Sequence, residues 1–252
     1  MLTANFIYAN DTTNVKTKYI RTSFSFFIGF PFPSQSSNFK EVYQNKIGGR
    51  NNYYSPSALL SSRFQIEVNK NLSLGLHLEY FASEFRDNFT LYYQIVGENI
   101  YRTFSEYLDI KSMPVILIAE YSPVTTPYKT YVGGGLGASF DDIYWYEEVN
   151  SNLSNDIRHS GVVYDKNPIS PMIKFYSGVL LNFDKKKPRD FLGALHFEVS
   201  INYIFRSLNI YEKLNQQYVQ PPEEFNEKYL FLPFYLSLSA GVSFNLFHPI
   251  EE

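Results

Sequence analysis

Two sites in this 252-residue sequence combine a histidine with a glutamate two positions later. His77 precedes Glu79, and His196 precedes Glu198. On a β-strand such residues share a face, so each imidazole could exchange a proton with its carboxylate or ligate a metal ion beside it. The four histidines show no further ligand spacing. We therefore expect packed, ion-paired residues here, with no metal site and no catalytic residues.

Two other motifs could carry chemistry. The run Gly133-Gly134-Gly135-Leu136-Gly137 has the composition of a phosphate-binding loop, but no helix-forming pattern follows it. Glycines at a bend in a strand, or beneath a bulky neighbour, explain it better. His159 and Ser160 are adjacent, yet no supporting constellation for a hydrolase accompanies them. We expect no cofactor and no enzymatic activity.

Four carboxylates surround an aromatic cluster. Asp141-Asp142 and Glu147-Glu148 flank Ile143-Tyr144-Trp145-Tyr146. Several oxygen ligands could bind calcium, but a solvated loop with aromatics packed on a rim is the favoured interpretation. Exposed aromatic residues are costly unless a partner covers them. The candidate partner-contact loop is therefore Tyr144, Trp145 and Tyr146.

The elements that must position these residues follow a period of two. Between residues 72 and 81, leucines and Tyr80 occupy one face, and Ser73, Gly75, His77 and Glu79 occupy the other. Similar alternation recurs along the chain. The predicted strands cover residues 19–30, 60–68, 72–81, 107–121, 128–140, 172–183, 195–205 and 234–246.

The connections alternate in length. Those at 69–71, 122–127 and 184–190 are short, whereas the others are long. Transmembrane barrels combine short periplasmic turns with long extracellular loops. We predict an all-β fold, a single closed antiparallel up-and-down transmembrane β-barrel of about eight strands. Within the third connection, 88–107 alternates around Gly97-Glu98-Asn99, which predicts a hairpin continuing above the membrane.

This topology predicts three segments. Residues 1–16 form an N-terminal periplasmic segment, 17–247 the transmembrane β-barrel, and 248–252 a C-terminal tail. Met1–Asn5 lack the basic and apolar regions of a signal peptide, so we expect a mature or engineered form.

Composition excludes several classes of protein. No stretch approaches the roughly 18 apolar residues of a transmembrane helix. The chain has no cysteine, which excludes disulfides and thiolate zinc sites. Its net charge of −3 gives no basic field for nucleic acid.

Alternation alone does not determine whether the apolar face of each strand points into the barrel or outward. A soluble lipocalin-like barrel turns its apolar face inward. Here the polar face is rich in Ser, Gly and Asn, and its few charges have mixed sign, as a narrow lumen requires. The predicted lumen polar network comprises Arg21, Arg63, Glu67, His77, Glu79, Lys174, His196 and Glu198.

One stretch resembles a known family. In 107–121, Pro114 is followed by Val115-Ile116-Leu117-Ile118 and Tyr121, and the next strand carries Gly133–Gly137. This pattern resembles the outer-membrane β-barrel domain family common in Bacteroidetes, which is similar to OmpA, OmpX and PorT barrels. The resemblance covers most of residues 17–247. It implies a barrel fold in the bacterial outer membrane and carries over no catalytic residues.

The sequence leaves three functions open. The first is a structural or interaction protein, or an accessory subunit of a larger outer-membrane complex, acting through its extracellular loops. The second is a narrow pore or transporter for small solutes, and the third is a soluble ligand-binding barrel. The expected partners are outer-membrane lipids and other outer-membrane or cell-surface proteins, with no nucleic acid.

Overall fold

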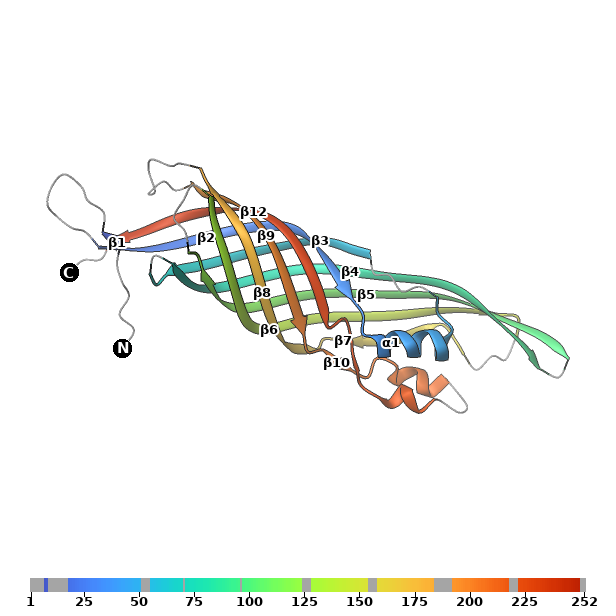
Figure 1. Ribbon diagram of the computed structural model, residues 1–252. Coiled ribbons are helices and arrows are strands. Elements are labelled where there is room, and N and C mark those ends of the chain that lie inside the picture. Colours follow the sequence, from blue (N-terminus) through green and yellow to red (C-terminus); the bar gives the residue numbers. More distant parts are fainter. Residues whose placement is uncertain are drawn as a thin grey trace.

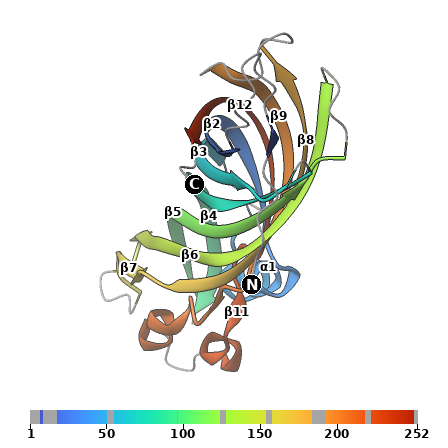
Figure 2. The ribbon, with the colours of Figure 1, turned by 90° about the vertical axis from the view of Figure 1, so that its left-hand side faces the viewer.

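Eight long strands form a closed antiparallel ring. The computed structural model describes residues 7–8, 18–50, 55–69, 71–95, 97–123, 128–153, 158–183, 192–217 and 222–249. The strand order around the ring is β2-β12-β9-β8-β6-β5-β4-β3, and pairing of β2 with β3 closes it (Figures 1 and 2). The predicted up-and-down barrel is confirmed.

The ring strands differ in length. They are β2 (Lys18–Ser34), β3 (Ser55–Glu67), β4 (Leu72–Ile95), β5 (Glu98–Tyr121), β6 (Tyr128–Ser151), β8 (Ile169–Asn182), β9 (Leu192–Ile204) and β12 (Phe234–Pro249). The turn between β3 and β4 is held by Asn69, whose Oδ1 accepts hydrogen bonds from the amides of Asn71 and Leu72, both at 2.9 Å. Side-chain capping by Asn is typical of such turns.

Shorter elements complete the chain. They are β1 (Ile7–Tyr8), α1 (Ser37–Val42), η1 (Tyr43–Ile47), β7 (Gly161–Lys166), β10 (Ser207–Leu208), η2 (Glu212–Gln217), η3 (Glu223–Asn226) and β11 (Tyr229–Leu230). α1 begins after Ser36, whose hydroxyl accepts a hydrogen bond from the amide of Phe39. Within the described residues, no helix has the length and apolar character needed to cross a membrane.

Three neighbouring strands extend well beyond the ring. β4, β5 and β6 each contain 24 residues, whereas a tilted strand crosses a bilayer with about 9–11. The predicted β4–β5 hairpin is confirmed: Thr90 pairs with Thr103, and Gly97 has a φ of 85° at the turn. The prediction that 141–151 is a loop is wrong, because these residues pair with β5 and continue β6 (Figure 1).

The ring carries its apolar face outward and its polar face inward. Leu74, Phe197 and Leu238 are 44%, 49% and 51% exposed, whereas His77 and Ser237 are buried. A closed ring with an apolar belt around a charged interior is the arrangement of a transmembrane barrel. The soluble lipocalin-like alternative is therefore wrong. The protein is an integral outer-membrane β-barrel surrounded by lipid, with long extracellular loops and short periplasmic turns.

A second core lies on the extracellular side. The extended strands β4–β7 are covered by α1 and η1, and by residues 207–217 and 222–232, the described parts of the 207–232 segment, which contain η2 and η3 (Figure 1). We call these covering segments together with the extended strands the extracellular cap. Its buried centre includes Phe39, Phe104, Trp145, Tyr211 and Phe225. The period of two predicted none of the helical turns, because short helices in long connections leave no repeating pattern.

Candidate functional site: the filled lumen and the extracellular cap

Arg63 occupies the centre of the lumen. Its guanidinium donates to Glu198 at 2.6 Å, to Glu120 at 3.2 Å and, through Nε, to Nδ1 of His77 at 3.2 Å. It also lies over the rings of Phe27 and Tyr176, at 4.8 and 4.4 Å from the centroids. The side chain is fully buried. Ion pairs and stacked rings therefore fill the middle of the barrel.

A second group of contacts surrounds Glu79. Its Oε1 lies 2.7 Å from Nε2 of His77 and also pairs with Lys174, while the hydroxyl of Tyr235 donates to Oε2 at 2.6 Å. Because an arginine can only donate, His77 must accept through Nδ1 and carry its proton on Nε2, facing Glu79. The histidine and glutamate are thus one link in a continuous hydrogen-bonded network rather than an isolated acid–base pair.

The structure joins five of the predicted lumen residues into this network: Arg63, His77, Glu79, Lys174 and Glu198. His196 is buried between the rings of Phe27 and Tyr131, and neither ring nitrogen has a hydrogen-bond partner among the described residues. Glu67 is half-buried. The side chain of Arg21 lies outside the described residues.

Several network members escaped prediction. Glu120 accepts from Gln65 at 3.0 Å, and Tyr131 donates to Glu198 at 3.2 Å. On β5 the inward face also carries Ile116 and Ile118, both buried. An apolar lumen face removes the polar–apolar contrast along this strand, so the direction of Glu120 could not be assigned from its neighbours.

The glycine-rich strand makes room for this filling. A Cβ on Gly133 would lie 2.3 Å from the ring of Tyr176, and one on Gly178 would lie 2.4 Å from that of Tyr131. Gly133, in the predicted run, thus lies beneath a bulky neighbour that crosses the lumen, as predicted, and so does Gly178. A phosphate cradle is not formed, because the run lies inside strand β6.

Asp141 and Arg206 close the extracellular mouth. Arg206 donates to both carboxylate oxygens of Asp141, at 2.6 and 2.8 Å, and to the carbonyls of Phe231 and Leu232 at 3.3 and 3.5 Å. Ser112 and Ser139 each donate to Asp141 at 2.7 Å. Three polar side chains, those of Arg206, Ser112 and Ser139, thus hold the Asp141 carboxylate. Through the carbonyls of Phe231 and Leu232, Arg206 also ties the 207–232 segment to the barrel wall.

The four carboxylates considered as an alternative calcium site do not converge. Asp141 and Glu147 are buried and face arginines, whereas Asp142 and Glu148 are exposed on the opposite face of β6. Among the described residues, no group of three or more His, Cys, Asp or Glu side chains could hold a metal ion. The solvated-loop interpretation is also wrong for this segment, since it is a strand in a packed sheet.

Trp145 is the main correction to the predicted contact loop. It is buried in the cap, and its Nε1 donates to Oε2 of Glu106 at 2.6 Å. Tyr144 is 38% exposed and Tyr146 is half-buried on the outer face. Since neighbours on a strand point to opposite faces, the three aromatics cannot form one surface.

A buried carboxylate pair accompanies Trp145. Glu106 on β5 lies opposite Glu147 on β6, and Arg158 binds Glu147 through both Nε, at 2.9 Å, and Nη2. Burial, and next the adjacent Glu147 carboxylate, raise the pKa of Glu106 well above its usual range. A single arginine therefore neutralises one carboxylate, and the protonated form of the other is favoured.

Tyr92, the most exposed aromatic side chain of the described residues, lies at the β4–β5 hairpin tip. Tyr92 and Tyr101 form a cross-strand pair, 80% and 47% exposed, and Tyr93 on the other face is 40% exposed beneath Arg102. Pairing with β6 ends at Arg102 and Ser151. The tip therefore projects beyond the rest of the cap (Figure 1). The sequence pattern predicted this hairpin but gave no reason to prefer its tyrosines to Trp145.

Comparison with known proteins returns the fold only. No protein-family model matches the sequence, and no curated protein matches it. The N-terminal β-barrel domain of Pseudomonas aeruginosa OprF is similar over 89% of this chain and 97% of its own, with 12% identity and a TM-score of 0.36.

Two other solved structures are similar in the same way. A major outer membrane protein from Thermus thermophilus has 14% identity and a TM-score of 0.45, covering 89% of this chain and 99% of its own. The outer membrane protein OprG from Pseudomonas aeruginosa has 12% identity and a TM-score of 0.40, covering 90% and 95%. These likenesses carry no argument about the activity of this chain.

Proposed function

We propose that this protein is a closed membrane anchor whose extracellular cap and β4–β5 hairpin bind a macromolecular partner at the cell surface. The observation that carries the proposal is that the lumen is filled, while a tyrosine-rich hairpin tip projects from the extracellular end. Arg63 and its partners occupy the barrel centre, and Arg206 ties the cap over the mouth. The exposed residues available for contact thus lie outside the barrel.

Composition of the hairpin tip supports a binding role. Tyr92, Tyr93 and Tyr101 offer large, rigid contact area, and Gln94 and Asn99 offer adaptable hydrogen bonds. Tyr with Asn and similar polar residues is a combination enriched in protein-binding loops. Exposed aromatics of this size are the usual anchors of an interface. A structural or accessory role within a larger outer-membrane complex would use the same surface.

A matched pair of variants tests this proposal. Full-length protein is purified from its native membranes in mild detergent, as wild type, as Tyr92→Ala/Tyr101→Ala and as Thr90→Ala/Thr103→Ala. The threonines form the next outward-facing pair on the same strands, with their hydroxyls 3.1 Å apart. A stoichiometric companion should be lost only from the tyrosine variant. Equal recovery from all three would exclude the tip as the contact.

The pore alternative makes a different prediction. A barrel of about eight strands has an interior just wide enough for its own side chains, and here those side chains are ion-paired. Planar-bilayer recordings of the wild type should show no steady open-channel current. A steady current would overturn the closed anchor and favour transport of small solutes.

A further inference from the structure

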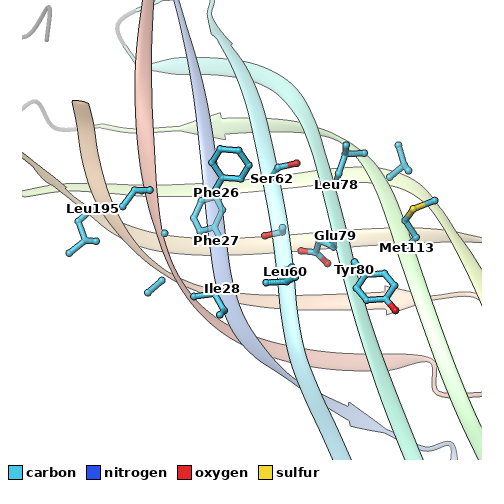
Figure 3. A pocket seen from close by; sticks show the side chains of 15 residues that line it. Phe26, Phe27, Ile28, Leu60, Ser62, Leu78, Glu79, Tyr80, Met113 and Leu195 are labelled. Atoms are coloured by element: carbon cyan, nitrogen blue, oxygen red, sulfur yellow. The ribbon is translucent and has the colours of Figure 1, made fainter. Parts of the chain in front are cut away.

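Inside the membrane wall, β4 has a neighbouring strand on each side. β3 pairs with one edge of β4 and β5 pairs with the other. Figure 3 shows this part of the wall, where Leu60 comes from β3, Tyr80 from β4 and Met113 from β5. At this level the two edges of β4 are therefore occupied.

The main-chain groups of β4 alternate between these two edges. The carbonyl of Asn71, just before the strand, accepts from the amide of Ser122 on the β5 side at 2.7 Å. The carbonyl of Leu72 accepts from the amide of Val68 on the β3 side at 2.9 Å. The β4–β5 register does not shift along the strand. Even-numbered residues of β4 therefore direct their N–H and C=O groups to the β3 side throughout.

The β3 side of β4 becomes open above the membrane. β3 begins at Ser55, opposite Glu84, and no described strand pairs with this side of β4 beyond that point, although β4 continues to the hairpin tip (Figure 1). We call this side of residues 89–95 the open β4 edge. Its outward-directed N–H and C=O groups have no hydrogen-bond partner among the described residues and belong to Thr90, Tyr92 and Gln94.

Other edges of the extended sheet are protected. Asn152 caps the β5 edge, where its Oδ1 accepts from the amide of Tyr101 and its Nδ2 donates to the carbonyl of Asn99, both at 3.0 Å. β7 has six residues, its register with β6 shifts, and its Lys166 pairs with Glu212 of η2 at 2.9 Å. Short strands, irregular pairing and covering segments are the usual protection of sheet edges. The open β4 edge lacks these features.

The composition of the open β4 edge also favours pairing. Residues 89–95 read Phe-Thr-Leu-Tyr-Tyr-Gln-Ile, with no charge, proline or glycine. Aromatic and β-branched residues favour strands, and charges or prolines that would block pairing are absent from this segment. On the outer face Tyr92 and Gln94 are exposed, whereas on the inner face Phe89 is buried and Leu91 is half-buried. A complementary strand would therefore alternate polar residues outside with apolar residues inside.

We propose that the open β4 edge binds an extended segment of a partner protein, which adds to the sheet as an antiparallel strand. Another β-strand supplies donors and acceptors at the spacing that this edge requires, which lipid chains and helices do not. The segment lies in line with β3 and directs its apolar side chains toward the Leu91 side of the sheet. This inference rests on the proposed binding role of the hairpin, and it specifies a polypeptide partner and main-chain pairing.

A second copy of this chain in the same membrane fits the edge less well. Both neighbours of β4 in the barrel run antiparallel to it. In a copy inserted in the same direction, β4 runs parallel to the first β4. Its β5 runs antiparallel, but that strand is already paired with β4 on one side and with β6 or Asn152 on the other. The antiparallel strand therefore comes from a different protein.

Two synthetic peptides test the main-chain contact. Both alternate threonine and valine over about eight residues, within the usual length of a strand, and carry fluorescein. One is N-methylated on its threonines and the other on its valines. Residues opposite each other in a hydrogen-bonded antiparallel pair share a face and exchange both bonds. The threonines, opposite Thr90, Tyr92 and Gln94 on the outer face, are therefore the residues that direct N–H groups to β4.

The valine-methylated peptide should bind full-length protein in detergent micelles about tenfold more tightly than the threonine-methylated peptide, because only its threonine N–H groups remain free to donate. Fluorescence anisotropy measures both affinities. Equal affinities, or no binding of either peptide, would overturn the proposal. This comparison uses the wild type and depends on no variant.

A proline on the open edge locates the contact. Thr90→Pro removes an N–H of the open edge and none from the β4–β5 ladder, and proline is tolerated on edge strands. It should weaken binding of the valine-methylated peptide about tenfold. Thr90→Ala is the matched comparison, because it removes the same side chain and keeps the N–H, and it should bind as the wild type does. Undiminished binding to Thr90→Pro would contradict the site. Gln94→Pro supplies the same test if Thr90→Pro fails to fold.

This inference and the proposed function can fail separately. Thr90→Pro is added to the co-purification from native membranes. A companion lost from Tyr92→Ala/Tyr101→Ala but retained by Thr90→Pro would preserve the binding role and refute strand addition. Recovery of no companion with any form, together with the expected order of the two peptides, would refute the proposed function alone. A wild-type dimer that Thr90→Pro dissociates would assign the edge to a second copy and overturn the inference.

Discussion

Glu106 and Glu147 lie directly opposite each other on β5 and β6, and both carboxylates are buried in the extracellular cap. Like charges at opposite positions of a sheet destabilise it. Arg158 compensates Glu147, and Trp145 donates to Glu106. One arginine can balance the charge of only one of the two carboxylates, so the pair is stable when the other carboxylate is protonated. The packing of this region therefore depends on pH.

The first prediction concerns that dependence. Because burial and Glu147 raise the pKa of Glu106 above its value of 4.5 in an unfolded chain, its stabilising contribution is complete below 4.5 and is lost as the pH rises through the raised pKa. Trp145 is the single tryptophan of the chain, so its fluorescence reports this site. A red shift is expected as the pH of the wild type is raised. Glu106→Gln should remove the shift, and an identical titration in both proteins would contradict the assignment.

The second prediction concerns Arg63 in the lumen. Arg63→Ala leaves Glu120 and Glu198 without their guanidinium and should lower the free energy of unfolding by about 3–5 kcal/mol, the usual cost of breaking a buried ion pair. Urea unfolding in detergent micelles measures it. Arg86→Ala is the control: its exposed ion pair with Asp109 spans 2.9 Å and should contribute about 1 kcal/mol or less. Similar losses in the two variants would show that the lumen network does not stabilise the barrel.

A third prediction addresses the tie between cap and barrel. Arg206→Ala removes the contacts to Asp141 and to the carbonyls of Phe231 and Leu232. The 207–232 segment should then become sensitive to protease added to intact cells, while the barrel remains heat-modifiable on gels. Lys46→Ala, which removes an exposed 2.7 Å ion pair with Glu224 in the same cap, should leave the cleavage rate nearly unchanged. Equal resistance of Arg206→Ala and wild type would show that apolar packing alone holds the segment.

The fourth prediction compares the stability cost of adding a methyl group at two glycines, one packed and one open. Gly133→Ala places a Cβ 2.3 Å from the ring of Tyr176 and should cost about 1–3 kcal/mol, as overpacking does. Gly161→Ala is the control, because nothing lies within 4 Å of its Cβ. Thermal unfolding followed by circular dichroism in detergent compares them. A Gly133→Ala variant as stable as Gly161→Ala would mean that the tyrosine ring moves freely in the lumen.

Much of the barrel could be predicted from residue order alone. Alternation such as that of Leu72–Tyr80 separates an apolar from a polar face, and the few charges of mixed sign on the polar face assign that face to the lumen. Short connections such as Asn69–Asn71 identify the periplasmic turns. The same pattern did not reveal the strand at Asp141–Ser151. Above the membrane both faces of a sheet can carry mixed residues, so the sequence of a strand there resembles that of a solvated loop.

Sequence by itself determined the strands of the ring, since these depend on a local period of two, and the few charges of mixed sign on the polar face determined its direction of burial. Only the tertiary structure decided which groups meet. Arg63 and Glu198 are 135 positions apart and touch because the ring closes, Thr90 lies opposite Thr103 because of the β4–β5 register, and Trp145 is buried because distant loops fold over it. Partners set by closure and register have no signature in the neighbouring residues of the chain.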